Sequence, residues 1–309
     1  MTDQPNRSAH TRGALYGLAA VCIWGAFIVV SRLAVRTSLT PWDVAAIRFS
    51  VAGVLLAPYL AMKGLAWSRL GWIGEIAIIA GCGAPMVLLV NAGLLFAPAA
   101  HGGALFPGVM PLMVAVLASI VLKEAFNVRK RIGFALIILG SAGIVWGSGG
   151  AFGTARTIGH VLFLTAGLAW ACYTVAMRRG QIDGLHAAAI AAVGSLVFYL
   201  PPYLFFAGTS VLNAPRFDIA VQAVVQGILT AIVALLLYGR MVRLLGASGG
   251  AAFVALTPVA TGLLAIPVLG EWPGVIDWLA IGLISFGVYV ASGGPLPGWR
   301  KRTAASFQP

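Results

Sequence analysis

The sequence has little charge and very few acidic residues. Of its 309 residues only 9% are charged, against about 25% in an average soluble domain, while 60% are hydrophobic. It has three cysteines, Cys22, Cys82 and Cys172, without CxxC spacing, a pattern that supports neither a disulfide framework nor a zinc site. A soluble fold does not need so much apolar surface, so we expect an integral membrane protein.

Long apolar runs occupy most of the chain. A helix needs about 20 mostly apolar residues to cross a bilayer, and the runs here are too long and unbroken for the alternating strands of a membrane barrel. We therefore predict an all-α integral membrane protein with ten transmembrane helices. The predicted spans are residues 13–33, 43–62, 71–96, 102–122, 130–148, 158–178, 185–207, 219–239, 249–269 and 275–292.

The net charge of +12 is distributed unevenly between the two sides of these spans. If the N-terminus is cytoplasmic, 15 of the 20 lysines and arginines fall on the inner side, as the positive-inside rule requires. We therefore predict that the N- and C-termini are both cytoplasmic and that nucleic acid is not a partner. Membrane lipid is an expected partner, and the basic tail at residues 299–302 is interpreted as a topology anchor.

An internal repeat relates the two halves of the chain. A shift of 147 residues aligns residues 101–124 with residues 248–271, and a shift of 146 aligns the first span with the sixth. The matched pairs include Pro111 with Pro258, Glu124 with Glu271, Trp24 with Trp170 and Arg32 with Arg178. Because each half has five helices, the second half enters the membrane from the opposite side, and inverted repeats of this kind favour alternating access.

The repeat defines the expected organisation of the chain. Two five-helix repeats are predicted at residues 13–148 and 158–292, joined by a periplasmic linker at 149–157. A cytoplasmic tail at residues 1–12 precedes them, and a basic cytoplasmic tail at 293–309 follows.

Several motifs are typical of one family of carriers. They are Trp24-Gly25, Arg48-Phe49, Pro111 with Lys123-Glu124, Gly133, and the second-half residues Trp170, Tyr173, Pro258 and Glu271. On these residues the chain resembles the EamA-type members of the drug/metabolite transporter superfamily over nearly its whole length. The resemblance implies a multi-pass inner (plasma) membrane exporter of small metabolites, amino acids or drugs, with a cavity between the halves. One departure is Ala99-Ala100-His101, where many members have a Tyr-Thr pair.

Candidate cavity residues lie deep within the spans. Trp24 and Trp170 fall near the membrane midplane, whereas lipid-facing tryptophans gather at the interfaces. Trp170, Tyr173 and Thr174 share one helical face, which is either a pocket wall or simple helix packing. The predicted substrate-cavity residues are Trp24, Asn91, Trp170, Tyr173, Thr174, Gln226 and Thr257. An aromatic cavity with little charge suggests a neutral, zwitterionic or amphipathic small-molecule substrate.

Three further residues are candidates for proton coupling or for hinges. Histidine is the residue type whose charge commonly changes near neutral pH, so His101, at the mouth of the fourth span, is the candidate for coupling to protons; the alternative is a solvated residue at a helix start. A counter-substrate is the other expected coupling partner. Pro111 and Pro258 each remove a backbone hydrogen bond at mid-span, which gives either a hinge or a static kink.

Other functional classes have weaker support in the sequence. Gly246 to Gly249 matches the GxSG motif of intramembrane serine proteases, but no partner histidine is evident for Ser248. The scattered histidines offer no metal site, and no phosphate-binding loop or other cofactor motif is present. We therefore do not expect an enzyme. A channel or facilitator is the nearest alternative to a secondary transporter, and the inverted repeat favours the transporter.

Overall fold

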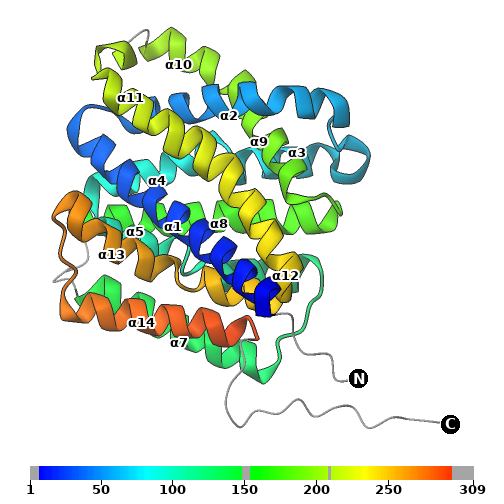
Figure 1. Ribbon diagram of the computed structural model, residues 1–309, viewed down its shortest axis with the longest axis vertical. Helices are drawn as coiled ribbons and strands as arrows, with labels where there is room; N and C mark the ends of the chain where they lie inside the picture. The colour runs from blue at the N-terminus through cyan, green and yellow to red at the C-terminus, as the bar shows by residue number, and fades with distance from the viewer. Residues whose placement is uncertain (1–6, 148–153, 208–209, 294–309) are drawn as a thin grey trace.

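A computed structural model describes residues 7–147, 154–207 and 210–293, and these residues form a bundle of helices (Figure 1). The helices are α1 (Arg7–Thr37), α2 (Pro41–Lys63), α3 (Trp67–Cys82), α4 (Ala84–Phe96), α5 (Ala99–Leu105), α6 (Met110–Val121), α7 (Val128–Gly147), α8 (Ala155–Arg179), α9 (Gly184–Phe198), α10 (Leu200–Ala207), the 3₁₀ helix η1 (Ser210–Asn213), α11 (Arg216–Gln222), the π-helix η2 (Ala223–Val233), α12 (Ala234–Val254), α13 (Thr257–Leu269) and α14 (Val275–Ala291).

The all-α fold class is confirmed, with differences at the ends of several spans. Within the described part of the chain, eight helical segments of 18 residues or more are apolar enough to cross a membrane, and α14 is a shorter apolar helix. Helix α7 has 20 residues and packs along α14. The first helix begins at Arg7 rather than residue 13, and α8 begins at Ala155, inside the segment predicted as a linker. The predicted C-terminal tail lies outside the described residues except for its first residue, as do residues 1–6 of the predicted N-terminal tail and residues 149–153 of the predicted linker.

Several spans are interrupted rather than continuous. The third consists of α3 and α4, which meet at Gly83, and the fourth consists of α5 and α6. The eighth passes from α11 through the π-helix η2 into α12. Helix α12 continues past Gly246, whose φ of 77° is outside the helical region. A sequence of apolar residues does not by itself reveal such breaks, because the composition is the same on both sides of each one.

Local sequence signals explain where individual spans begin and end. At the start of α2, the Thr40 side chain accepts a hydrogen bond from the Asp43 backbone N–H, and the Asp43 carboxylate accepts one from the Thr40 N–H. This capping box satisfies two N–H groups that a helix start leaves free. Gly64, with a φ of 72°, ends the same helix. These caps fix α2 to residues 41–63.

The packing of the helices follows an inverted repeat. Helix α1 of the first half packs on α12 and α13 of the second, and its counterpart α8 packs on α3, α4 and α6 of the first. The second and seventh spans pack on each other through α2 and α9, and the fifth and tenth through α7 and α14. In Figure 1 α7 and α14 run side by side along one edge of the bundle. Equivalent spans therefore meet across a pseudo-twofold axis.

The α7–α14 contact shows this symmetry at single residues. An added Cβ on Gly133 would lie 2.6 Å from the Gly287 carbonyl oxygen, and one on Gly140 would lie 2.8 Å from that of Ala280. The shift of 147 residues converts one contact into the other, since it maps Gly133 onto Ala280 and Gly140 onto Gly287. Small residues allow the two backbones to approach this closely, as at many membrane helix interfaces.

Candidate functional site

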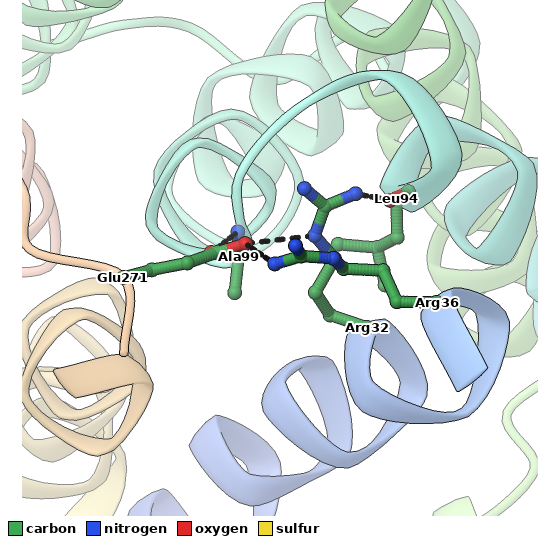
Figure 2. Close-up of polar contacts among 5 residues, drawn as sticks. All are labelled: Arg32, Arg36, Leu94, Ala99 and Glu271. Carbon is green, nitrogen blue, oxygen red and sulfur yellow. Dashed lines mark hydrogen bonds and ion pairs between the residues drawn. The ribbon is translucent and has the colours of Figure 1, made fainter. Parts of the chain in front are cut away.

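Charged side chains from both halves meet at one end of the bundle. The Arg32 Nε donates to Glu271 Oε1 at 2.9 Å, and Arg36 Nη1 donates to the same oxygen at 3.3 Å. The other oxygen, Glu271 Oε2, accepts the backbone N–H of Ala99 at 2.8 Å. Arg32 also donates to the carbonyl oxygen of Leu94 (Figure 2). We call Arg32 and Glu271 the Glu271 pair, and this end of the bundle the Glu271 end.

The Glu271 pair ties four spans together. Arg32 is on α1, Leu94 on α4, Ala99 begins α5, and Glu271 follows α13. The two side chains are only 12% and 16% exposed. Hydrogen bonds to charged groups contribute about 1.5–3 kcal/mol each, more than neutral ones, so this network stabilises the contacts among the four spans.

The repeat places an equivalent pair at the opposite end of the bundle. Arg178, the counterpart of Arg32, donates to Glu124, the counterpart of Glu271. We call these residues the Glu124 pair and their surroundings the Glu124 end. Here the side chains are 42% and 33% exposed. Exposed ion pairs contribute only about 0–1 kcal/mol, so the Glu124 end is held much more weakly.

A surface hollow lies beside the Glu124 pair. It has a volume of about 700 Å³ and opens widely to the surface. Its lining residues are Leu122, Glu124, Met177, Arg178, Arg179, Gln181, Ile182 and Asp183. Met177 lies one turn from Tyr173 and Thr174 on α8, so the hollow meets the helical face predicted to line a cavity.

The predicted aromatic cavity residues divide into two groups. The Trp170 ring lies 5.1 Å from that of Tyr173 and 6.4 Å from that of Phe106 on the fourth span. Thr174 donates its hydroxyl to the Trp170 carbonyl oxygen. The Trp24 ring contacts Tyr238 of α12, at 5.6 Å between ring centres. The two tryptophans thus lie on equivalent helices, each against an aromatic residue of another span.

The predicted polar cavity residues differ in whether their atoms are already bonded. Asn91 Oδ1 and Thr257 Oγ1 are buried and have no hydrogen-bond partner in the described structure. Gln226, in contrast, accepts from Arg48 Nη1 at 3.1 Å and donates to Ser31 Oγ at 2.6 Å. A buried polar atom without a partner costs free energy that a ligand can recover, so Asn91 and Thr257 are the better placed of the three to bind one.

Both prolines stand at breaks in their spans. Pro111 is the second residue of α6, which follows the break after α5, and Pro258 is the second residue of α13, which follows the break after α12. At the start of a helix the missing N–H of proline costs no internal hydrogen bond. The predicted kinks are therefore helix boundaries in equivalent positions, and their movement stays a prediction.

The structure places His101 away from solvent. The side chain is 2% exposed, so the alternative of a solvated residue at a helix start is wrong. Its Nδ1 lies 3.0 Å from His160 Nε2, and its Nε2 lies 3.3 Å from Asp277 Oδ1. His101 and His160, which are far apart in the sequence, are therefore in contact. Among the described residues, no group of three His, Cys, Asp or Glu side chains is arranged to hold a metal ion.

Sequence reasoning missed three features of this site. The ion pairs of Glu124 and Glu271, each of which joins the two halves, were not predicted. His160 and Asp277 had no predicted role. The repeat offered a signal for the ion pairs, since it conserves both the arginine and the glutamate, and the depth of His160 and Asp277 in their spans matches that of His101.

The described helices pack as two inverted repeats, an arrangement that many membrane transporters share. The chain belongs to the EamA-like transporter family, whose model matches residues 11–146 and 157–293. It is 25% identical over 292 residues to the uncharacterized inner membrane transporter YedA of Escherichia coli strain K12, covering 91% of this chain and 90% of that protein.

Two other comparisons agree with this assignment. The uncharacterized transporter YyaM of Bacillus subtilis strain 168 is 26% identical over 197 residues, which cover 62% of this chain and 64% of YyaM. A crystal structure with 20% sequence identity shares the fold, with a TM-score of 0.57 over 91% of this chain and 96% of that one. The protein is therefore a multi-pass inner membrane transporter of the EamA family.

Proposed function

We propose that the protein is a secondary transporter that exports a neutral, zwitterionic or amphipathic small molecule by alternating access. The Glu271 end faces the periplasm and the Glu124 end faces the cytoplasm, following the distribution of lysine and arginine in the sequence. The observation that carries the proposal is the inequality of the two equivalent ion pairs. One is enclosed and has four polar contacts, whereas the other is exposed beside a hollow of about 700 Å³.

The inequality of the two ion pairs supports the assignment of a conformational state. If the two halves exchange conformations, the Glu124 pair takes the enclosed arrangement and the Glu271 pair takes the exposed one. The present structure corresponds to the state closed to the periplasm and open to the cytoplasm. Both arrangements use an arginine–glutamate pair, so the free-energy difference between the two states can stay within a few kcal/mol. Arg36, whose counterpart is Ile182, adds a contact at the Glu271 end alone.

The repeat also predicts the contact that closes the opposite end. Glu271 accepts the backbone N–H of Ala99, and the shift of 147 residues maps Ala99 onto Gly246 and Glu271 onto Glu124. We therefore expect Glu124 to accept the backbone N–H of Gly246 when the cytoplasmic end is closed. Gly246 lies at a break in α12, with a φ of 77°, just as Ala99 lies at the break before α5.

A route for the substrate follows the face of α8. It leads from the hollow past Met177 to Thr174 and Trp170. Aromatic rings on this face supply apolar area, and the unpartnered oxygens of Asn91 and Thr257 supply hydrogen-bond acceptors inside the bundle. This combination suits an amphipathic molecule with a hydrogen-bond donor better than an ion.

A distance measurement tests alternating access without a known substrate. Spin labels at Leu95 and Trp272, both exposed, report on the Glu271 end in a variant whose native cysteines are replaced. Labels at Ala125 and Arg179, also exposed, report on the Glu124 end. Double electron–electron resonance in liposomes then gives the distribution of distances at each end.

The informative variant is Glu271→Gln, with its repeat counterpart Glu124→Gln as the matched control. Glu271→Gln removes the charge that holds Arg32 and Arg36 and should raise the open fraction at its own end about tenfold or more, while closing the other end. Glu124→Gln should change the open fraction at either end less than threefold. If the Glu271 end opens while the Glu124 end stays unchanged, the two ends are uncoupled and alternating access is wrong.

A flux assay distinguishes a carrier from a channel. A panel of labelled amino acids and amphipathic metabolites is offered to proteoliposomes containing wild type or Trp170→Ala. A carrier gives flux that saturates with substrate and falls in Trp170→Ala. Conductance that does not saturate in either protein would favour the channel alternative.

A further inference from the structure

Three titratable side chains form a chain of contacts near the Glu271 end. His101 on α5 lies between His160 on α8 and Asp277 in the first turn of α14. The exposed fractions of the two histidines are 2% and 4%, and that of Asp277 is 17%. Asp277 also accepts the backbone N–H of Gly274 through Oδ2 at 2.9 Å, which fixes the carboxylate while Oδ1 faces His101.

Few other charged groups lie near these three side chains. Arg156, in the first turn of α8, is within electrostatic range of His160 and Asp277. Glu271 approaches through its bond to the Ala99 backbone, two residues before His101, and is itself paired with Arg32 and Arg36. The basic residues of α7, the other charged helix in contact with α5, are at 129–131, close to its start at the opposite end of the bundle. The carboxylate of Asp277 is therefore the anion in direct contact with the histidines.

The hydrogen-bond pattern accommodates one added proton. With both imidazoles neutral, His101 donates from Nε2 to Asp277 and accepts at Nδ1 from His160 Nε2. A proton that enters at His160 Nδ1 allows the Nε2 hydrogen of His160 to move across the 3.0 Å contact to His101 Nδ1. Both contacts are then kept, and His101 is an imidazolium between a neutral imidazole and a carboxylate. A second proton would place two cations in direct contact, which is strongly unfavourable.

We propose that His101, His160 and Asp277 form a proton-binding site that couples proton uptake to closure of the Glu271 end. The inference rests on the alternating access proposed above. His101 belongs to the first half, whereas His160 and Asp277 belong to the second, so opening this end by separating the halves breaks both contacts. The imidazolium is stabilised by Asp277 only while the end is closed, and by linkage a bound proton stabilises the closed state.

The proposal predicts the sign of a pH effect. Since protonation favours closure, acidification should increase the closed population at the Glu271 end. Protonation of Glu271 would act in the opposite direction, because it weakens the bonds from Arg32 and Arg36. The sign of the change therefore separates the histidine site from a simple titration of the ion pair.

The test measures the distance between labels at Leu95 and Trp272 in liposomes between about pH 5.5 and 8, where histidine changes charge. In wild type we expect the ratio of closed to open protein to rise about tenfold on acidification, in the range of ordinary coupling energies. The logarithm of that ratio should change with pH with a slope no greater than one, because one proton is bound. A slope near two would overturn the single-proton site.

Variants of each member identify the site. His101→Gln and His160→Gln keep hydrogen-bonding capacity but cannot take the charge, and Asp277→Asn removes the anion that stabilises it. Each should reduce the pH-dependent change to less than about twofold. The matched control is His186→Gln, whose ring contacts the Gly64 carbonyl oxygen elsewhere in the protein, and it should keep the full change. A wild-type response in both His101→Gln and Asp277→Asn would overturn the proposal.

The same spin-label distances distinguish a failure of the proton-site proposal from a failure of alternating access. If Glu271→Gln opens one end and closes the other, but wild type shows no pH response, alternating access stands and the proton site is wrong. If neither end moves in any variant or at any pH, alternating access itself is wrong.

Discussion

The two ends of the molecule carry equivalent arginine–glutamate pairs that differ in how completely each is enclosed. At the Glu271 end the pair is 12% and 16% exposed and is bonded to backbone groups of two further helices. At the Glu124 end the pair is 42% and 33% exposed and borders a hollow. The repeat supplies the arginine and the glutamate to both ends, although Arg36, which also bonds Glu271, aligns with Ile182. We propose that the difference in exposure between the two pairs reflects the conformational state. Equivalent residues in unequal surroundings thus mark which end of a repeat protein is closed.

The largest expected effect comes from reversing the charge of Arg32. Arg32→Glu places a carboxylate against Glu271 in a partly buried site, and breaking such a pair costs about 3–5 kcal/mol. The closed population at the Glu271 end should fall about 100-fold or more, as measured by the distance between labels at Leu95 and Trp272. The double variant with Glu271→Arg should recover a large part of the loss. No recovery would show that the pair does not act through its charges.

A second prediction concerns an asymmetry inside the bundle. Arg48 on α2 is 6% exposed and bonds Gln226 of the π-helix η2. Gln226→Leu leaves the Arg48 guanidinium without this acceptor. We therefore expect the free energy of unfolding to fall by about 1.5–3 kcal/mol, measured by thermal unfolding in detergent. Gln222→Leu, which removes a neutral bond to the Val30 carbonyl oxygen, should cost about 1 kcal/mol or less. Equal losses would mean that Arg48 finds another partner.

Arg178→Gln tests the exposed pair and should have a small effect. The ion pair with Glu124 is exposed, so its loss should change stability by about 0–1 kcal/mol and leave the Glu271 end closed. The expected functional effect is on the rate of exchange between the two states, because the pair becomes enclosed only in the opposite state. A loss of stability as large as that in Arg32→Glu would contradict the inequality of the two ends.

The smallest expected effect belongs to the prolines. Pro111→Ala and Pro258→Ala replace residues at helix starts, where proline costs no internal hydrogen bond, and should change stability by less than about 1 kcal/mol. If the breaks are hinges, both substitutions should slow the exchange between open and closed distances to a similar extent. Unchanged exchange in both variants would identify the breaks as static.

The large-scale fold was predictable because it depends on features that the sequence displays directly. Long apolar runs locate the spans, and the pairing of Pro111 with Pro258 and of Glu124 with Glu271 reveals the repeat. The inverted packing follows from the odd number of helices in each half. The exact start of α1 and the breaks within the spans were not predictable, because apolar residues favour a helix on both sides of a break.

The site was only partly predictable, for a geometric reason. The sequence shows that Arg32 and Glu271 have counterparts, but not that they contact each other, because contact depends on how each helix is rotated about its axis. The same limit applies to His101, whose partners His160 and Asp277 are distant in sequence and share only its depth in the membrane. The π-helix around Gln226 has no composition signal, since its i→i+5 bonding leaves the residue types unchanged.

The α7–α14 interface has a consequence for the origin of the architecture. Its Gly133–Gly287 and Gly140–Ala280 contacts exchange under the repeat operation, so the interface is isologous, as in a twofold-symmetric homodimer. A single five-helix polypeptide inserted in both orientations could form the same contacts with a second copy of itself. Joining two copies into one chain allows each copy to diverge, as at His101, which the shift of 147 residues aligns with Ser248.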